Sequence, residues 1–136
     1  MPFFKLIYLV FSEDRVKEMN KFEKIINVNY PSLIINKYFN LSEPLEMLST
    51  YGVMAPEYIF IEDLHMADST YSTLRKICRL EKLSESKIVV FGSETNKLDY
   101  AKLRNCRAKV LKIPDYDNFN LNEISASLKQ TFRRIE

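Results

Sequence analysis

Short apolar segments alternate with segments of helical spacing along the whole chain, and this rhythm limits the fold more than any other feature. The apolar segments are rich in β-branched and aromatic residues, as buried strands are. They cover residues 4–11, 32–39, 58–61, 87–91 and 108–113. Strands that alternate with helices form parallel sheets with helices on both faces. The sequence therefore predicts an α/β fold, a doubly wound five-stranded parallel sheet.

The helices are expected between these strands, and each has a start or stop signal. Asp14 is placed to cap the first helix, and Asp68 or Ser69 to cap the third. The second helix is expected to open at Ser42 and close near Gly52. The fourth is predicted over residues 95–104, and a capping box of Asn120 and Glu123 predicts a fifth through Phe132.

Length and charge favour a single globular domain over residues 1–136 that binds neither nucleic acid nor membrane. A chain of 136 residues can bury a core without disulfides or metal. The net charge is +2, and basic and acidic residues are interleaved, as in residues 15–18, which are typical of a solvated helix face. The apolar N-terminal segment is interrupted by Lys5 and is too short to span a bilayer. We expect it to be a buried strand.

The two cysteines lie far apart in the sequence, without the spacing of a metal site or a disulfide framework. This usage is typical of a reducing cytoplasm. Cys78 is predicted to be a small buried side chain of the third helix. Cys106 is expected in a loop between Arg104 and Arg107, where positive charge favours the thiolate. We expect neither cysteine to have a redox role.

Polar residues follow the predicted strands, and the carboxyl ends of parallel strands meet at one edge of a sheet. Glu13 and Asp14 follow the first strand, and Glu62 and Asp63 follow the third. Carboxylates on neighbouring strands can hold a hard cation such as Mg²⁺. Two glycines are too few for a dinucleotide fingerprint or a phosphate-binding loop.

The order of these segments resembles the receiver domain of two-component response regulators, the CheY-like domain, along nearly the whole chain. Residues 56–62 resemble that family's third strand, residues 63–66 its Asp-Leu-x-Met string, and residues 74–77 its third helix. Residues 112–114, Lys-Ile-Pro, resemble its Lys-Pro pair. The resemblance implies a flavodoxin-like (βα)5 fold. It also implies acids that bind Mg²⁺, an aspartate that accepts a phosphoryl group, a hydroxyl after the fourth strand, and a lysine after the fifth.

Two registers compete at the third strand. With Asp63 at the acceptor position, Glu62 occupies a strand position that is normally apolar, and an unpaired buried carboxylate is costly there. With Glu62 at that position the strand keeps its apolar pattern, and we favour this register while both stay open. In that frame Gly92 stands where a hydroxyl is expected, with Ser93 one residue late and Lys112 one residue early.

These departures predict a pseudo-receiver, a stand-alone receiver-like module with weak or absent phosphoryl acceptance. The predicted site has Glu62 or Asp63 at the acceptor position, with Ser93 and Lys112 nearby. Glu13, Asp14 and Asp63 are the predicted ligands of a weakly bound Mg²⁺ ion. The protein is expected to be cytoplasmic, not to be an enzyme, and to act through contacts with a histidine kinase or a downstream signalling protein.

Two other functions compete with this prediction. One is a small Mg²⁺-dependent phosphotransfer or hydrolytic enzyme of flavodoxin-like fold that uses Glu13, Asp14 and Asp63. The other is a nucleotide- or flavin-binding protein, which the acidic loop and the scarcity of glycine disfavour. The single histidine, His65, excludes Ser-His-Asp and multi-histidine sites and is expected to be a loop residue rather than a phosphoryl carrier.

In receivers the surface of the fourth helix, fifth strand and fifth helix meets partner proteins. The same surface is therefore the predicted partner surface here, and a homodimer through it is one option. Its expected side chains are basic or aromatic: Lys97, Tyr100, Lys109, Tyr116 and Lys129.

Overall fold

A five-stranded, all-parallel sheet forms the centre of the molecule, with strand order β2-β1-β3-β4-β5. The computed structural model describes residues 5–50, 52–113, 126, 129 and 130. The strands are β1 (Lys5–Val10), β2 (Leu33–Tyr38), β3 (Tyr58–Glu62), β4 (Lys87–Gly92) and β5 (Lys109–Lys112). The predicted doubly wound α/β fold is confirmed.

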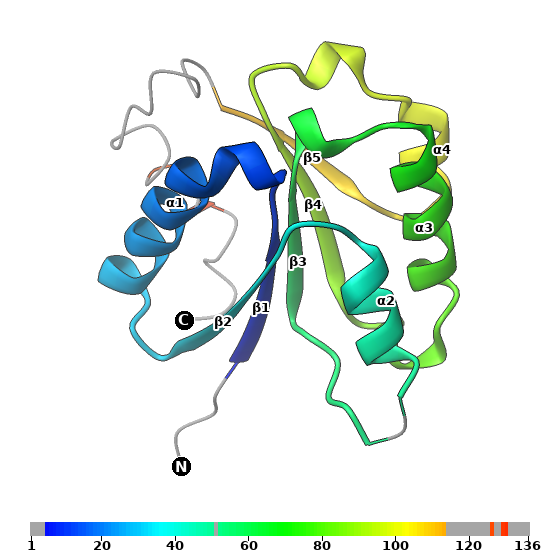
Figure 1. Cartoon of the computed structure of the whole chain (residues 1–136), viewed down its shortest axis with the longest axis horizontal. Coiled ribbons are helices and arrows are strands. Elements are labelled where there is room, and N and C mark those ends of the chain that lie inside the picture. Colours follow the sequence, from blue (N-terminus) through cyan, green and yellow to red (C-terminus); the bar gives the residue numbers. More distant parts are fainter. Residues whose placement is uncertain (1–4, 51, 114–125, 127–128, 131–136) are drawn as a thin grey trace.

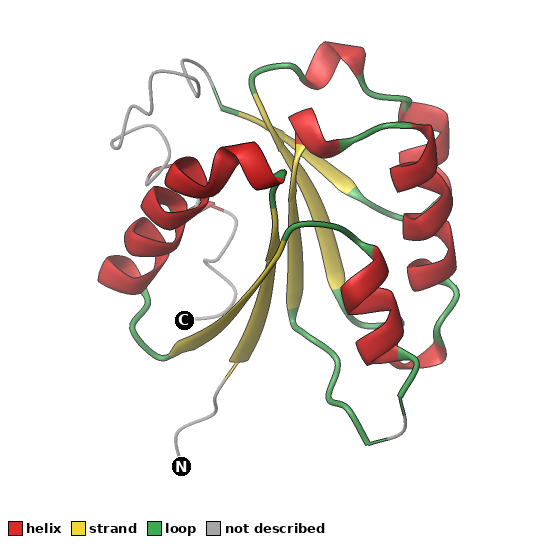
Figure 2. Cartoon of the chain, in the orientation of Figure 1, coloured by secondary structure: helices red, strands yellow, loops and turns green. Residues whose placement is uncertain are grey.

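Helices cover both faces of this sheet (Figures 1 and 2). Helix α1 (Val16–Asn29) lies on one face, and α2 (Ser42–Leu48), α3 (Asp68–Cys78) and α4 (Tyr100–Asn105) lie on the other. Four short 3₁₀ turns complete the described elements: η1 (Glu13–Arg15), η2 (Asp63–His65), η3 (Glu81–Leu83) and η4 (Thr95–Lys97). Three of them, η1, η2 and η4, follow the carboxyl ends of β1, β3 and β4, where the predicted site lies.

Alternate strand residues build two separate cores, because successive side chains of a strand point to opposite faces. The core under α1 is aromatic: Phe22 of α1 stacks on Phe91 of β4, with ring centroids 4.6 Å apart. The opposite core is mainly aliphatic, apart from the Tyr8–Tyr38 pair, and joins β3 and β4 to the buried residues Leu74 and Ile77 of α3. Both faces of β3 are buried along its whole length, so the strand is held from both sides.

The helix boundaries differ from the predicted ones where a local cap decides them. Asp14 lies inside η1, and α1 begins at Val16 without a side-chain cap. Helix α2 ends at Leu48, before Gly52. The predicted helix over residues 95–104 is split, because Asp99 accepts a hydrogen bond from the Lys102 N–H (3.1 Å) and starts α4 afresh.

Two further differences concern the start of α3 and the end of β3. Helix α3 begins at Asp68, with Ala67 rather than a polar residue at its N-cap. Strand β3 continues to Glu62, one residue beyond the predicted strand. The predicted fifth helix, from Asn120 to Phe132, lies almost entirely outside the described residues, as does Tyr116.

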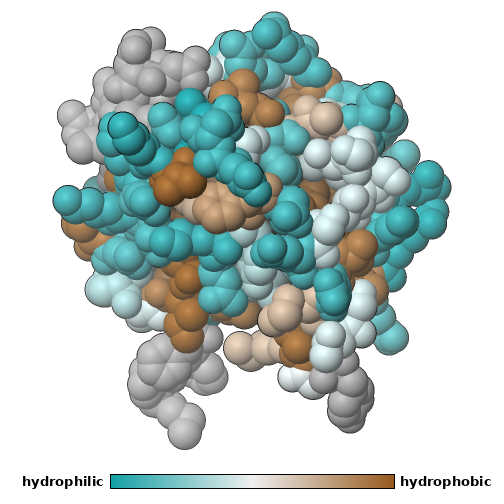
Figure 3. Space-filling view, in the orientation of Figure 1, coloured by the Kyte–Doolittle hydropathy of each residue, from teal (hydrophilic) through white to brown (hydrophobic). Residues whose placement is uncertain are grey.

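Hydrophilic residues prevail on the molecular face seen in Figure 3, and the hydrophobic ones form separate spots between them. The large apolar side chains that are most exposed are Val28, in α1, and Met54, in the loop between α2 and β3. Among the described residues, no helix is long and apolar enough to cross a membrane.

Candidate functional site at the carboxyl edge of the sheet

Strand register decides which side chains meet at the carboxyl edge. The ladder pairs Glu62 of β3 with Phe91 of β4, so Asp63 comes to lie beside Gly92. The next ladder pairs Gly92 with Lys112 of β5. Asp63, Gly92 and Lys112 therefore form one row across three neighbouring strands, whereas Glu62 belongs to the row below it.

Glu62 points to the α1 side of the sheet, where it forms a buried ion pair. Its side chain is 0% exposed, and its two carboxylate oxygens accept hydrogen bonds from Arg15. The Arg15 Nε lies 3.0 and 3.2 Å from the two oxygens, and Nη2 lies 2.9 Å from Oε2. This two-pronged geometry gives the strongest kind of charged hydrogen bond. Arg15 thus ties the start of α1 to the end of β3.

Asp63 is also buried, but within the described residues only one of its two carboxylate oxygens accepts a hydrogen bond. The side chain is 5% exposed, and Oδ2 accepts a hydrogen bond from the Glu94 N–H at 2.6 Å. The buried Oδ1 has no hydrogen-bond partner among the described residues. Burial raises the pKa of Asp63 from 3.8 to about 6, against the lowering effect of the Glu94 and Leu64 N–H groups, and the charges of Glu62 and Glu94 raise it further.

Gly92 makes room for this carboxylate. Its φ is +145°, a conformation that side chains other than glycine rarely adopt. A Cβ atom placed there would overlap the carboxyl group of Asp63. The hydroxyl that the resemblance implies after the fourth strand is therefore absent for a steric reason, because Asp63 occupies the space that its side chain would need.

The loop after β1 turns its acids outward. Glu13 and Asp14 are exposed in η1. Ser12, which precedes them, lies 3.3 Å from His65 Nδ1 through its hydroxyl. Burial lowers the pKa of His65, so its ring is neutral at pH 7, and Ser12 and His65 form an uncharged contact across the edge.

The predicted metal ligands do not fit a bound ion. In the part of the chain that the structure describes, no three acidic, histidine or cysteine side chains come together as a metal site. Glu13 and Asp14 are exposed, whereas Asp63 is buried against Gly92. A hard cation needs several oxygen ligands directed at one point, and these three carboxylates do not supply them.

Of the two remaining predicted residues, Lys112 belongs to the row of Asp63, and Ser93 comes one residue after it. Ser93 is half-buried in the loop after β4, and Lys112 is exposed at the end of the edge strand β5. Of the residues that the sequence predicted for this site, only Glu62, Asp63, Ser93 and Lys112 lie at the carboxyl ends of β3, β4 and β5.

Arg15 is the functional residue that sequence reasoning missed. The mixed charges of residues 15–18 predicted a solvated helix face. Arg15 Nη1 does lie 3.7 Å from Glu18 Oε1, as expected for such a face. The stronger contact is with Glu62, 47 residues away. A signal was available: a glutamate at an apolar strand position needs a buried cation, and an arginine just after the neighbouring strand can supply it.

The comparisons with known proteins agree with this fold. No family model matches the sequence, and no curated protein matches it. The similar solved structures include the phosphorylated cyanobacterial phytochrome response regulator RcpA, with a TM-score of 0.73, 13% identity, and coverage of 96% of this chain and 92% of that one. The structure of the CheY-like response regulator receiver domain from Methylobacillus flagellatus has a TM-score of 0.69 and 17% identity. The match covers 98% of this chain and 100% of that one.

A third similar structure is the Mn²⁺-bound form of the response regulator Rcp1, with a TM-score of 0.69, 13% identity, and coverage of 94% of this chain and 91% of that one. The resemblance to CheY-like receiver domains is thus confirmed at the level of the fold. Rcp1 was solved with Mn²⁺, whereas among the described residues of this chain no three acidic, histidine or cysteine side chains come together as a metal site.

Replacing Arg15 should destabilise the protein, because it leaves the carboxylate of Glu62 buried without its cation. We expect Arg15→Ala to lower the free energy of unfolding by roughly 3–5 kcal/mol. Urea denaturation followed by circular dichroism measures this. Glu18→Ala removes only the more exposed partner of Arg15 and should cost less than about 1 kcal/mol. Equal losses in the two variants would contradict a special role for the buried pair.

Asp63 should make stability depend on pH. Because its pKa is raised in the folded state, the folded protein binds the proton more tightly, and stability falls as pH rises from about 4 through about 6. Asp63→Asn should therefore stabilise the protein at pH 7 by up to roughly 3 kcal/mol and have little effect at pH 4. Urea titrations at both pH values measure the difference, and exposed Asp14→Asn is the control. A gain that is the same at both pH values would argue against this titration.

The contact between Gly92 and Asp63 can be tested with the other glycine of the chain. Gly52 also has a positive φ, +86°, but open space surrounds it. Both Gly→Ala variants introduce backbone strain, and only Gly92→Ala adds a steric overlap, which costs a further 1–3 kcal/mol or so. In an Asp63→Ala background this additional loss should disappear. If it persists there, the overlap lies elsewhere.

Proposed function

We propose that this protein is a pseudo-receiver, a CheY-like signalling module that acts through protein contacts and accepts a phosphoryl group weakly or not at all. The observation that carries the proposal is the packing of the Asp63 carboxyl group onto Gly92. This packing buries the only carboxylate in the row that also holds Gly92 and Lys112.

Phosphoryl transfer to a carboxylate requires an oxygen that can approach phosphorus in line with the leaving group. Asp63 Oδ1 is buried against Gly92, and Oδ2 is engaged by the Glu94 N–H. Limited access to both oxygens therefore opposes acceptance at Asp63.

Glu62 is no better placed to be an acceptor. It is fully buried on the α1 side, and its carboxylate accepts hydrogen bonds from both Nε and Nη2 of Arg15. Attack by Glu62 on phosphorus would require this ion pair to separate and leave the half-buried Arg15 without the carboxylate of Glu62, which is costly. We therefore expect neither Glu62 nor Asp63 to accept a phosphoryl group efficiently.

The transition state of phosphoryl transfer needs compensating positive charge. The carboxylates that would bind a divalent ion are not brought together among the described residues, and Lys112 is exposed on the edge strand. Arg15 is a fixed cation, but its charge is already matched by Glu62. The same observations disfavour the alternative of a Mg²⁺-dependent enzyme that uses Glu13, Asp14 and Asp63.

A module without a phosphorylation switch acts through a surface that is always presented. The predicted partner surface keeps exposed basic and aromatic side chains on its described part: Lys97, Tyr100, Lys109 and Lys129. Tyr100 donates its hydroxyl hydrogen to the Thr95 carbonyl (2.8 Å), which fixes its ring on the surface. A protein partner with acidic and apolar residues would match these side chains.

Incubation with acetyl phosphate and Mg²⁺, followed by intact mass spectrometry at neutral pH, tests the proposal. We expect only a minor phosphorylated fraction, because both oxygens of Asp63 are withheld from the donor. A phosphorylation-competent receiver run in parallel controls for the reagent, and Asp63→Asn and Glu62→Gln assign any adduct. Stoichiometric phosphorylation that Asp63→Asn abolishes would refute the proposal.

A further inference from the structure

The two cysteines, 28 residues apart in the sequence, meet in the fold. Cys78 is the last residue of α3, and Cys106 follows the last residue of α4. The Cys78 thiol donates a hydrogen bond to the Cys106 carbonyl, with 3.6 Å between sulfur and oxygen. The chain has no other cysteine, so this contact brings both of its cysteines together.

We propose that Cys78 and Cys106 are a redox site, at which a peroxide converts the two thiols into a disulfide that links the end of α3 to the end of α4. Neither receiver chemistry nor a partner protein is needed for this reaction. The proposal therefore stands apart from the proposed signalling function and can fail without it.

Cys106 is held in place by the cap that ends α4. The Arg107 N–H bonds to the Arg104 carbonyl, and the Ala108 N–H bonds to the Leu103 carbonyl, each at 3.0 Å. These are the two hydrogen bonds of a Schellman motif, with Arg107 in the left-handed conformation at φ 55°. Because non-glycine residues are uncommon there, the turn is under some strain and its geometry is well defined. The backbone of Cys106 is thus fixed against α3.

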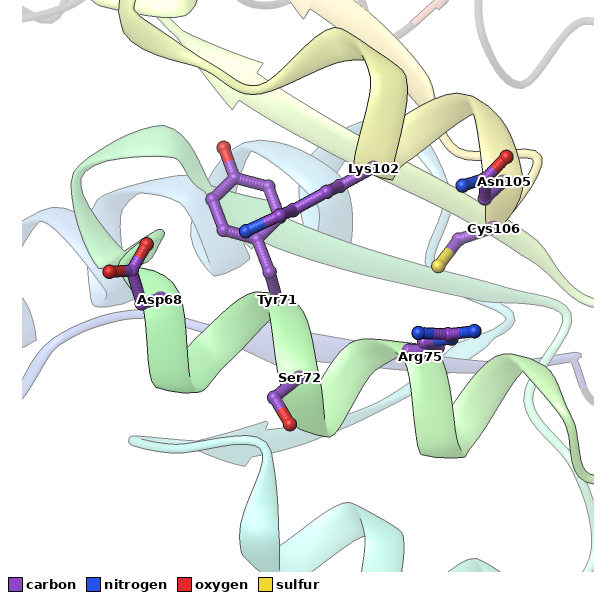
Figure 4. A pocket seen from close by; sticks show the side chains of 7 residues that line it. All are labelled: Asp68, Tyr71, Ser72, Arg75, Lys102, Asn105 and Cys106. Carbon is purple, nitrogen blue, oxygen red and sulfur yellow. The ribbon is translucent and has the colours of Figure 1, made fainter.

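Both cysteines are half-buried and line a surface recess of about 250 Å³. Cys106 also lines a second recess of similar size between α3 and α4, with Arg75 and Lys102 (Figure 4). In that view its thiol points toward Arg75, from the opposite side of the recess.

The two thiols have different chemical roles. Burial raises the pKa of Cys78, and the neighbouring Cys106 thiol raises it further through a hydrogen bond and through charge. Cys78 therefore stays protonated, and Cys106, which lines both surface recesses, is the thiol that we assign to the first step. This division is that of an attacking and a resolving cysteine.

The reaction balances with a peroxide as the oxidant. The Cys106 thiolate attacks the O–O bond of hydrogen peroxide and becomes a sulfenic acid, and the released hydroxide takes up a proton to form water. The Cys78 sulfur then attacks the Cys106 sulfur and loses its proton, and the sulfenic oxygen leaves as a second water. Two electrons pass from the thiols to the peroxide, and a dithiol reductant reverses the change.

The disulfide would change the surface beside α4. It would lock the Schellman turn to α3 and fix the strand β5 that begins three residues after Cys106. Strand β5 and the residues that precede α4 belong to the predicted partner surface. Oxidation would thus act on the part of the molecule that is available to a partner.

The full-length protein, treated with hydrogen peroxide and then alkylated, tests the proposal. We expect a mass lower by two hydrogen atoms, loss of both alkylatable thiols, and a linked peptide pair that contains Cys78 and Cys106. Dithiothreitol should restore both thiols. The folded protein should form the link at least about tenfold faster than the urea-unfolded chain, because the fold brings the sulfurs together in advance.

Single variants separate the two roles. In Cys78→Ser, dimedone should trap a sulfenic acid at Cys106, whereas Cys106→Ser should give an adduct at least about tenfold weaker at Cys78. Retention of both free thiols after peroxide treatment would overturn the proposal. So would a disulfide found only between chains, or one that forms as fast in urea as in the folded protein.

Discussion

The ion pair between Arg15 and Glu62 holds the carboxyl edge of this protein in its observed arrangement. A glutamate with no exposed surface at the end of a central strand must have a cation, and Arg15 supplies one from the turn that opens α1. Because Arg15 faces inward, the acids beside it in η1 face solvent. A single internal charge pair therefore sets the direction of the loop after β1 and removes its carboxylates from the edge.

Asp63 and Gly92 form the second constraint, and they depend on each other. The carboxyl group of Asp63 fills the position that a side chain at residue 92 would need, and the positive φ of Gly92 lets the backbone pass beside it. The Glu94 N–H then fixes Oδ2, which leaves Oδ1 enclosed. In this arrangement an acidic residue at a strand end serves packing and local hydrogen bonding rather than exposure to a ligand.

The sequence was sufficient to predict the fold because the pattern of buried strands is local. Phe91, Ile59 and Val90 occupy strand positions that their spacing predicts, and the sheet follows from the alternation with helices. The helix boundaries were harder to predict from the sequence. Asp99 caps the start of α4 through one hydrogen bond, and the helical spacing of residues 95–104 gives no sign of that boundary.

The site was predictable only in part, because its chemistry depends on contacts between distant residues. The argument that placed Glu62 at the acceptor position assumed that a buried carboxylate before Asp63 would be unpaired. Arg15, 47 residues earlier, supplies the missing charge, and no local pattern identifies that partner. Similarly, the closeness of Cys78 and Cys106 depends on how α3 and α4 pack, which their separation in sequence does not reveal.

The mutual fit of Asp63 and Gly92 has an evolutionary consequence. A serine or threonine at position 92 would place its side chain against the carboxyl group of Asp63, so no single codon change at that position supplies an unobstructed hydroxyl. An unobstructed hydroxyl there requires the backbone and the aspartate to move together. Each of these two residues therefore limits the substitutions that the other can accept. Neutral drift can change the outer surfaces of the protein more easily than it can change this strand end.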